Sequence, residues 1–521
     1  MPRSSRSLAP ALLAAEALVV LTAACSGGGS AAAPAPAPTL TLSFTRVPGP
    51  GLDAVEVAVD VSGSEATPSL AVDRGSLGPI ARTVGGRFVG TLLPTTTGEY
   101  RVTATVAATS IVRTALVLQD VHADWEQPQS VAGLVNTDGC EDGVTIAPDG
   151  QTLFVHYGPF RWSSLLVFQE SRANGGCGGN RLVPDRCTHP WLDTTIGPLA
   201  GPERPGFFTG RFNGTTQLHN AASFGIGPDG APVLALTTMF YGFRKQPDGS
   251  FAAPFSLAFD DLGDGIVGPF GLSFQPIGGD SHRAVFTLKD AVTVGNGFDA
   301  DAYTCEVVFG TTNVLGTYVA TTPGNPPARS TPFPSVLLDL GDNTGTQGNP
   351  SLYFGVGGDV RSVWTDDEYD GDADTGRITV HVLGSGVFPS SNDFTKVVLP
   401  AVVNVPGTTA IQPTFRDEGL YFTQDTSIAF AAYAGTHDAA ALGDGNNWSA
   451  PVTLLQKDTS IASLRVTTAD LGKIVAIGEP TVAVVDGRRV LYFVYAWVRG
   501  IDPITGFADL DFQAGFVPAA N

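Results

Sequence analysis

Positive charge is scarce in this chain of 521 residues. Only 15% of the residues are charged, and 29 lysines and arginines stand against 50 aspartates and glutamates, which gives a formal net charge of −21. A protein that binds nucleic acid neutralises phosphates with Lys and Arg side chains. The composition therefore argues against a nucleic-acid partner. It favours a protein kept soluble by its charge in an extracellular or periplasmic space.

The N-terminus has an apolar run, but the run is too short to span a membrane comfortably. Arg3 and Arg6 precede it, it extends from Leu8 to Ala24, and Glu16 interrupts it. A basic start followed by a short apolar stretch is typical of a secretory signal peptide. We therefore predict that residues 1–24 are a signal peptide.

The end of this run, Leu21-Thr22-Ala23-Ala24-Cys25, resembles the lipobox of bacterial lipoproteins. In that family the Cys is diacylated and becomes the mature N-terminus. The resemblance implies a bacterial envelope protein anchored to a membrane through a lipid on Cys25, and Ser26, which is not Asp, implies the outer membrane. Residues 25–38 supply a flexible and then semi-extended tether. Cleavage without lipid attachment is the alternative.

Cysteine is scarce as well, with five in the whole chain. No pair has C-x-x-C spacing, and the seven histidines form no H-E-x-x-H or H-x-H cluster, so such metal sites are not expected. The four cysteines after Cys25 are an even number in a chain bound for an oxidising compartment, which predicts two disulfides. We predict pairs of Cys177 with Cys187, which share a glycine-rich segment, and of Cys140 with Cys305; the sequence allows three pairings.

Glycine and proline, in contrast, are abundant at 63 and 38 residues, a composition of short strands and tight turns. Alternating runs such as Val55 to Val61 and Arg101 to Val106 recur between residues 39 and 121. Gly98-Glu99-Tyr100 resembles the tyrosine corner of immunoglobulin-like domains, which implies a β-sandwich over this region. In exported bacterial proteins such modules are mostly spacers. We therefore expect removal of residues 39–118 to be harmless.

Residues 122–521 contain a repeated hairpin pattern. Six times an apolar run meets a Gly/Asp turn and continues as a second run, and Gly and Asp tolerate the positive φ of such turns. The six turns are Pro148-Asp149-Gly150, Pro228-Asp229-Gly230, Gly278-Gly279-Asp280, Gly357-Gly358-Asp359, Asp417-Glu418-Gly419 and Val485-Asp486-Gly487.

A second element, an aromatic residue followed three positions later by Pro or Val, opens five short apolar runs. The pairs are Trp125 with Pro128, Phe251 with Pro254, Phe333 with Val336, Phe394 with Val397, and Trp448 with Pro451. The first pair precedes all six hairpins, and none follows the last hairpin. The chain is therefore expected to close a circular array, with Trp125 to Leu134 as the outer strand of the final unit.

The hairpins resemble the WD-like repeats of bacterial β-propellers, most closely at Ala147 to Phe154 and Glu479 to Phe493. We predict an all-β protein in which an immunoglobulin-like sandwich precedes a propeller over residues 122–521. Six blades are expected, with five as the alternative.

Polar residues lie ahead of the predicted first strands, which in a propeller line the central channel. Three of these strands open with a polar residue, then Pro, then Ser or Thr. Such positions ring the mouth of the channel, where ligands are expected to bind. The predicted ligand-binding residues are Glu141, Asn220, Asn349 and Gln412.

Two carboxylates at the mouth of the predicted channel suggest a catalytic site. Glycoside cleavage needs one acid to protonate the leaving oxygen and a second carboxylate as base or nucleophile, and closure of the array would bring Asp142 beside Glu479. Hydrogen bonding of both side chains to nearby backbone is the alternative. No nucleophile elbow, P-loop or dinucleotide fingerprint occurs.

One acidic run is a candidate for Ca²⁺. Asp370, Asp372 and Asp374 place carboxylates at every second residue, so that a curled loop would aim their oxygens at one ion. A solvated acidic loop is the alternative. His156 and His381 lie inside apolar runs and are expected in the core.

The leading functional hypothesis is an envelope lipoprotein that binds an unknown protein or glycan through its propeller. A propeller glycoside hydrolase or lyase acting on polysaccharide is the alternative, and a purely structural role in the envelope is a third. The sequence does not indicate an oligomeric state.

Overall fold

The computed structural model describes residues 37–520 with internal gaps, and residues 38–521 form one compact unit. All structural statements below concern the described residues. The gaps are residues 138–139, 159–207, 213–214, 220–221, 227–231, 237–238, 258–265, 280, 291–299, 309–335, 341–347, 356, 368–376, 404–407, 414–419, 426–428, 462–464 and 502–505.

The described chain is all-β, as predicted, and its sheets are almost entirely antiparallel. Helical structure is confined to four short segments. They are α3 (Ala439–Leu442) and the 3-10 turns η1 (Val84–Gly86), η4 (Gly445–Asn447) and η5 (Thr468–Asp470).

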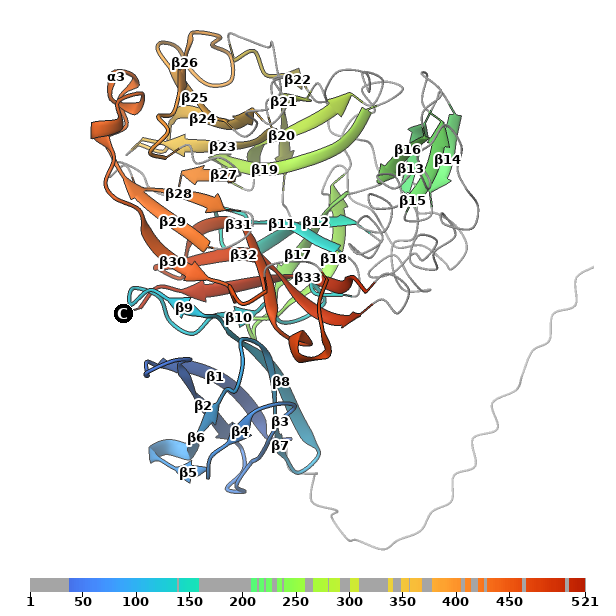
Figure 1. Ribbon diagram of the computed structural model, residues 1–521, viewed down its shortest axis with the longest axis vertical. Helices are drawn as coiled ribbons and strands as arrows, with labels where there is room; N and C mark the ends of the chain where they lie inside the picture. Colours follow the sequence, from blue (N-terminus) through green and yellow to red (C-terminus); the bar gives the residue numbers. More distant parts are fainter. Residues whose placement is uncertain are drawn as a thin grey trace, which may run out of the picture. The chain divides into compact units, whose positions relative to one another are not determined.

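The N-terminal strands form two groups that share one apolar core (Figure 1). The first group pairs in the order β1-β2-β6-β4, with β5 also on β6, and the second in the order β8-β7-β3. The alternating apolar residues predicted here point into this core. The strands are β1 (Thr39–Val47), β2 (Ala54–Ser62), β3 (Ser69–Val72), β4 (Ser76–Leu77), β5 (Ala81–Arg82), β6 (Arg87–Leu93), β7 (Gly98–Val106) and β8 (Thr109–Val117).

The Tyr100 side chain closes the turn that precedes its own strand. It is completely buried, and its hydroxyl donates to Thr96 O at 2.7 Å. The backbone N–H groups of Thr95 and Thr96 donate to the same hydroxyl at 3.0 and 3.1 Å. One side chain therefore satisfies three polar groups of the turn, an arrangement typical of a tyrosine corner.

The rest of the described chain contains five groups of four antiparallel strands. Four groups pair in sequence order, and the fifth takes its outer strand from the start of the region. The first group has β11 (Cys140–Ile146), β12 (Thr152–Gly158), β17 (Met239–Lys245) and β18 (Phe251–Leu257). The second has β19 (Ile266–Gly278), β20 (Ser281–Asp290), β21 (Ala300–Val308) and β22 (Val336–Leu337). The third has β23 (Gly348–Phe354), β24 (Val360–Asp367), β25 (Arg377–Leu383) and β26 (Phe394–Val398).

The last two groups each involve a strand from the start of the region. The fourth has β27 (Thr408–Pro413), β28 (Leu420–Asp425), β29 (Ala429–Ala434) and β30 (Val452–Gln456), with β9 (Asp120–Val121) added at its outer edge. The fifth has β31 (Ile474–Val485), β32 (Arg488–Ile501), β33 (Ala508–Pro518) and then β10 (Gln129–Ser130).

All six predicted turns lie between paired antiparallel strands, but one hairpin is not in a four-stranded group. The strands that flank residues 228–230 pair only with each other, and a second two-stranded sheet precedes them. Both sheets come between β12 and β17, which pair directly. The four strands are β13 (Phe208–Phe212), β14 (Thr215–His219), β15 (Ala222–Ile226) and β16 (Pro232–Leu236).

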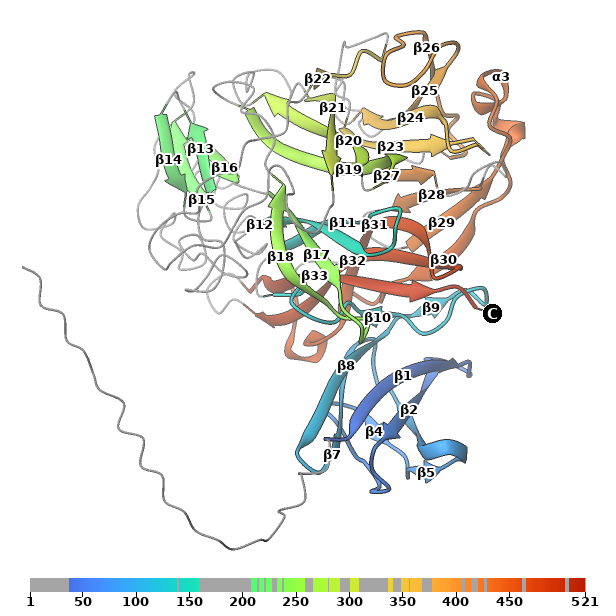
Figure 2. The ribbon, with the colours of Figure 1, turned by 180° about the vertical axis from the view of Figure 1, so that it is seen from behind.

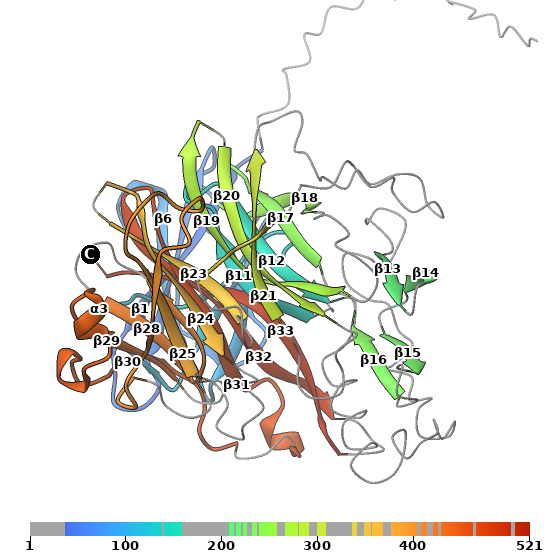
Figure 3. The same ribbon diagram turned by 90° about the horizontal axis from the view of Figure 1, so that it is seen from above.

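The first strands of the five groups contact one another in a cycle. Strand β31 contacts β11, β11 contacts β19, β19 contacts β23, β23 contacts β27, and β27 contacts β31. Figures 1 and 2, which view the chain from opposite sides, show these strands grouped around a common centre. In Figure 1 the strands β23, β24, β25 and β26 follow one another away from this centre, and Figure 3 shows the same strands from above.

The segment predicted to supply the last outer strand does so. Gln129 pairs with Phe516 and Ser130 with Gly515, and Trp125 forms a further bridge with Ala519. The backbone N–H of Val131 also donates to the Ala514 carbonyl at 2.9 Å. The edge of β33 is therefore covered, as edge strands of soluble proteins usually are.

The N-terminal strands do not behave as a separable spacer. Strand β8 pairs with β10, so its sheet continues into the fifth group. Leu116 and Leu118 lie in one buried cluster with Phe493. Because removal of residues 39–118 would expose this cluster, we expect the deletion to destabilise the chain rather than to be harmless.

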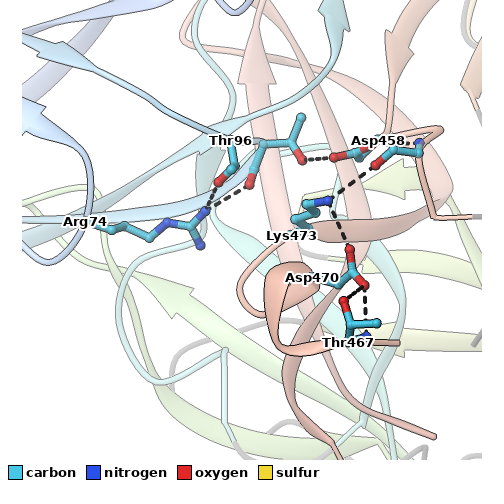
Figure 4. A network of polar contacts seen from close by, with 8 residues as sticks. Arg74, Thr96, Asp458, Thr467, Asp470 and Lys473 are labelled. Atoms are coloured by element: carbon cyan, nitrogen blue, oxygen red, sulfur yellow. Dashed lines mark hydrogen bonds and ion pairs between the residues drawn. The ribbon is translucent and has the colours of Figure 1, made fainter. Parts of the chain in front are cut away.

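Polar contacts reinforce this connection. Arg74 donates to Gly472 O at 2.8 Å, and Thr97 Oγ1 donates to Asp458 Oδ2 at 2.8 Å. Figure 4 shows Arg74 with Thr96 and Asp458, beside the ion pair of Lys473 with Asp470 at 3.0 Å. Salt bridges that remain partly exposed contribute little individually. The apolar cluster therefore stabilises the connection more than these contacts do, and the contacts fix its orientation.

Candidate functional site

The innermost strands share one irregularity. In β11, β19, β23 and β31 the pairing register shifts by an extra residue, which is a β-bulge. At one shift in each of these four strands a residue has positive φ: Gly143 (63°), Gly271 (54°), Asn349 (43°) and Glu479 (51°). The same bend is therefore built with glycine in two strands and with a polar side chain in the other two.

The two non-glycine residues are the unusual members of this set. Glycine adopts positive φ without a steric penalty, and Asn does so more readily than most residues. Glu479 has neither advantage, and it also precedes Pro480. A side chain held in an unfavourable backbone conformation is a feature that clusters at functional sites. The bulges at Asn349 and Glu479 therefore mark the candidate site.

Each polar residue lies against the glycine of the neighbouring group. A Cβ atom on Gly143 would lie 2.6 Å from Glu479 Oε2. A Cβ atom on Gly271 would lie 2.6 Å from Asn349 Cα and 3.0 Å from Asn349 Oδ1. At Gly271 the close atom belongs to the backbone of Asn349, so a side chain does not fit there. At Gly143 the close atom is the end of the flexible Glu479 side chain, and the positive φ of 63° is what favours glycine. The two junctions, Gly143 with Glu479 and Gly271 with Asn349, therefore differ in whether a side chain or the backbone approaches the glycine.

Hydroxyl groups two residues beyond the bulges join neighbouring strands. Thr481 Oγ1 donates to Val144 O, and Thr145 Oγ1 donates to Leu272 O, each at 2.9 Å. The Ser273 hydroxyl accepts from the N–H of Leu352 at 3.3 Å. Each bond connects an inner strand to the next one in the cycle. These bonds therefore hold the bulges at one level.

The sequence analysis missed the glycines and hydroxyls of these junctions, although a signal exists. The four bulges read Gly143-Val144-Thr145, Gly271-Leu272-Ser273, Asn349-Pro350-Ser351 and Glu479-Pro480-Thr481. A Ser or Thr follows the bulge residue by two positions each time. Aligning the repeats on this hydroxyl would have identified the glycines as the counterparts of Asn349 and Glu479.

The backbone positions of the predicted carboxylate pair, Asp142 and Glu479, lie at one junction. Asp142 lies in β11 opposite His156, directly before Gly143, against which the Glu479 carboxylate lies. Glu479 is partly exposed. The Asp142 side chain lies outside the described residues, as do the side chain of Gln412 in β27 and all of Asn220.

Glu141 lies in the interior. Its side chain has no exposed surface, Thr137 Oγ1 donates to Oε1 at 2.5 Å, and among the described groups Oε2 accepts no hydrogen bond. Burial raises its pKa well above the ordinary value, the hydrogen bond from Thr137 opposes this, and the nearby charge of Asp511 adds to it. The side chain is thus enclosed in the interior rather than presented to solvent.

The predicted Ca²⁺ ligands Asp370, Asp372 and Asp374 lie outside the described residues. Within the described ranges no three His, Cys, Asp or Glu side chains gather so as to hold a metal ion. His156 and His381 are buried at 4% and 1% exposure, as predicted.

Of the predicted disulfide partners, Cys140 on β11 and Cys305 on β21 are buried. Cys177 and Cys187 lie outside the described residues. The part of the chain that is described contains no disulfide bond. The two pairings stay predictions.

No helix in the described part of the chain is both long enough and apolar enough to cross a membrane.

Comparison with known proteins identifies no family. No family model matches the chain, and no curated protein matches it. Among solved structures, an α-L-arabinofuranosidase from Lactobacillus brevis is similar at a TM-score of 0.32 and 13% identity, over 56% of this chain and 89% of its own. A protein of unknown function from Bacteroides thetaiotaomicron is similar at a TM-score of 0.24 and 10% identity, over 92% and 98%. Similarity at this level carries no argument about fold or function.

Proposed function

We propose that this chain is a lipoprotein of the bacterial cell envelope, in which an immunoglobulin-like sandwich over residues 39–121 precedes a ligand-binding β-propeller over residues 122–521. The signal peptide of residues 1–24, the lipidated Cys25 and the tether of residues 25–38 anchor it in the outer membrane. The lipobox resemblance at Leu21 to Cys25 supports the anchor.

The hydrogen bonds of Tyr100 and the two strand groups around one core support the immunoglobulin-like assignment. Five four-stranded groups with inner strands in cyclic contact support a propeller of five blades rather than six. The five aromatic elements agree, because each precedes or opens an outer strand: β10, β18, β22, β26 and β30. The hairpin β15–β16 then belongs to an insertion between β12 and β17.

The observation that carries the binding proposal is the pair of bulges with positive φ at Asn349 and Glu479, each lying against a glycine of a neighbouring group. A carboxylate and an amide, held at one level of the cycle by bulges, would offer a ligand one charged acceptor and one donor–acceptor group. A protein segment or a glycan has hydroxyl and amide groups that match them. We propose the channel mouth at these two junctions as the binding site.

The test compares three proteins on a glycan and peptide array: the unchanged chain, Glu479→Gln and the matched control Glu56→Gln in β2. We expect ligands of the unchanged chain to bind Glu479→Gln about 10-fold or more weakly, because a charged hydrogen bond is lost. The control should bind as before. Equal binding by all three proteins would show that Glu479 is not part of the binding site.

A propeller glycoside hydrolase is the second candidate. It is favoured by the Glu479 carboxylate lying against the residue that follows Asp142. Incubation of bound glycans with the protein should then release shorter products, and Glu479→Gln should lower kcat by orders of magnitude with little change in ground-state binding. Binding without any product from a panel of polysaccharides would leave the binding function alone.

The anchor and the Ca²⁺ site are tested separately. Cys25→Ala should move the protein from the detergent phase to the aqueous phase, and unchanged partitioning would reject lipidation at Cys25. Calorimetric titration with Ca²⁺, together with melting in chelator, tests the loop of Asp370, Asp372 and Asp374. No heat and an unchanged Tm would remove it.

A further inference from the structure

A chain of polar side chains connects the N-terminal sandwich to the C-terminal strands. The Tyr495 hydroxyl on β32 contacts Glu99 Oε1 on β7 and also contacts Gln513 Oε1 on β33 at 2.9 Å. Gln513 Nε2 donates to Asp511 Oδ2 at 3.0 Å. Tyr495 has no exposed surface and Asp511 is 3% exposed. The order of the chain is Glu99, Tyr495, Gln513, Asp511.

The number of hydrogens that these four side chains can donate decides how many of their contacts are hydrogen bonds. Three contacts join the four residues, and each needs one donor. Tyr495 has a single O–H, and the Gln513 amide can turn its N–H group toward only one of its two neighbours. If Glu99 and Asp511 are both ionised, their carboxylates can only accept hydrogen bonds. The Tyr495 O–H and the Gln513 N–H are then the two donors for three contacts, so one contact has no hydrogen between its two oxygens.

We infer that this set of four side chains holds one additional proton, carried by the Glu99 carboxyl. The four side chains then form a pH-sensitive link between the N-terminal strands and the C-terminal strands. Glu99 O–H then donates to Tyr495, Tyr495 O–H donates to Gln513 Oε1, and Gln513 Nε2–H donates to Asp511. All three contacts become hydrogen bonds.

The charges around the chain favour Glu99 over Asp511 as the carrier. Arg499 Nη1 lies 3.6 Å from Asp511 Oδ1, and its Nε also contacts Asp509 at 3.2 Å, which favours an ionised Asp511. The nearby acid Glu141 is completely buried, which raises its pKa well above the ordinary value.

At the Glu99 end, Asp73 favours the neutral acid, whereas Arg74 and Arg101 oppose it. Burial is the largest influence and raises the Glu99 pKa to about 7, while the hydrogen bond with Tyr495 opposes the rise. Ser130, which faces the Tyr495 hydroxyl, has its own O–H to donate and therefore does not remove the need for the proton.

The direction of the pH effect follows. The folded pKa of Glu99 lies above its unfolded value of 4.5, so its proton is bound more tightly in the folded chain. This contribution to stability is complete below pH 4.5 and is lost as the pH rises through about 7. When the proton leaves to solvent, Tyr495 turns its O–H to the Glu99 carboxylate and Gln513 Oε1 loses its donor.

The test is thermal unfolding of the full chain and of Glu99→Gln across this pH range, with Glu56→Gln as a matched control. In Glu99→Gln the side-chain amide donates to Tyr495 at every pH, as the protonated acid does. We expect the Tm of Glu99→Gln to match that of the unchanged chain at low pH and to exceed it above pH 7 by on the order of 2 °C. The control should follow the unchanged chain throughout.

Two further readouts keep the inference open to failure. In a Tyr495→Phe background the pH-dependent advantage of Glu99→Gln should persist, because burial is the largest cause of the raised Glu99 pKa and the hydrogen bond with Tyr495 opposes it; loss of the advantage would contradict the inference. The infrared signal of a protonated carboxyl should also be smaller in Glu99→Gln at pH 6. If Glu99→Gln lowers the Tm equally at every pH and leaves that signal unchanged, Glu99 is an ionised acceptor and the link does not exist.

Discussion

The N-terminal sandwich and the C-terminal strands β31 to β33 belong to one connected sheet system, yet they bury different groups. The sandwich core consists of apolar side chains and Tyr100, whose hydroxyl is satisfied within its own turn. Beside the C-terminal strands the interior holds Glu141 and Asp511, with Asp509 close by. The stability of the first region therefore depends on the burial of apolar side chains. The stability of the second region depends on apolar burial and on the protons that its buried acids bind.

The largest effect is expected from removing the connection between the two regions. Deletion of residues 122–138 removes β10 and leaves the edge of β33 unpaired, and unpaired edges invite aggregation. We expect insoluble protein, measured as the soluble fraction after expression. Deletion of residues 39–118 should also destabilise the chain, because it opens the cluster around Phe493. A soluble 39–118 deletion with an unchanged Tm would restore the spacer interpretation.

The next largest effect concerns the buried acid of the second region. Because the folded pKa of Glu141 is raised well above 4.5, the folded chain loses stability as the pH rises above that value. Glu141→Gln keeps an acceptor for Thr137 and cannot ionise. Its stability should equal that of the unchanged chain at pH 4 and exceed it at pH 8 in urea titrations.

The exposed acid Glu306, an ion-pair partner of Arg283, provides the matched control. Glu306→Gln should not change the pH profile. If Glu141→Gln is less stable than the unchanged chain at pH 8, the acid is ionised and stabilised by groups beyond those described.

A smaller and pH-independent loss is expected in the first region. Tyr100→Phe preserves the packing but leaves two backbone N–H groups and one carbonyl of the Thr95–Thr96 turn without their partner. We expect a loss of about 2 kcal/mol in the free energy of unfolding. The loss should be the same at pH 5 and pH 8, and a loss that varies with pH would erase the contrast between the regions.

The smallest effect is expected at His437, outside both regions. Its Nε2 lies 2.8 Å from Ser362 Oγ, which also accepts from Trp364 Nε1 at 2.9 Å. Burial lowers the His437 pKa from 6.5 to about 4. Stability should therefore fall as the pH drops from 6.5 to about 4, because the unfolded chain binds the proton more tightly.

His437→Phe keeps a ring against Tyr353, with which His437 stacks at 4.2 Å. It should flatten the acid side of the Tm profile while costing little near pH 7. An unchanged slope between pH 6.5 and 4 would show that other groups cause it.

The local pattern of the sequence determined the strands and their turns. Gly and Asp at the six turns, and alternation within the flanking runs, depend only on residues close together in the chain. Tyr100 likewise acts within its own turn, and the offset of Trp125 from the last hairpin was enough to predict the pairing with β33.

Only the tertiary structure decided which segments meet. The hairpin β15–β16 has the same local pattern as the other five, yet β12 pairs past it with β17. Glu479 lies against Gly143, more than three hundred positions earlier in the chain, and Glu99 meets Tyr495 across a similar separation in sequence. Burial, and with it the raised pKa of Glu99 and of Glu141, is a property of such distant neighbours. No local pattern in the chain encodes it.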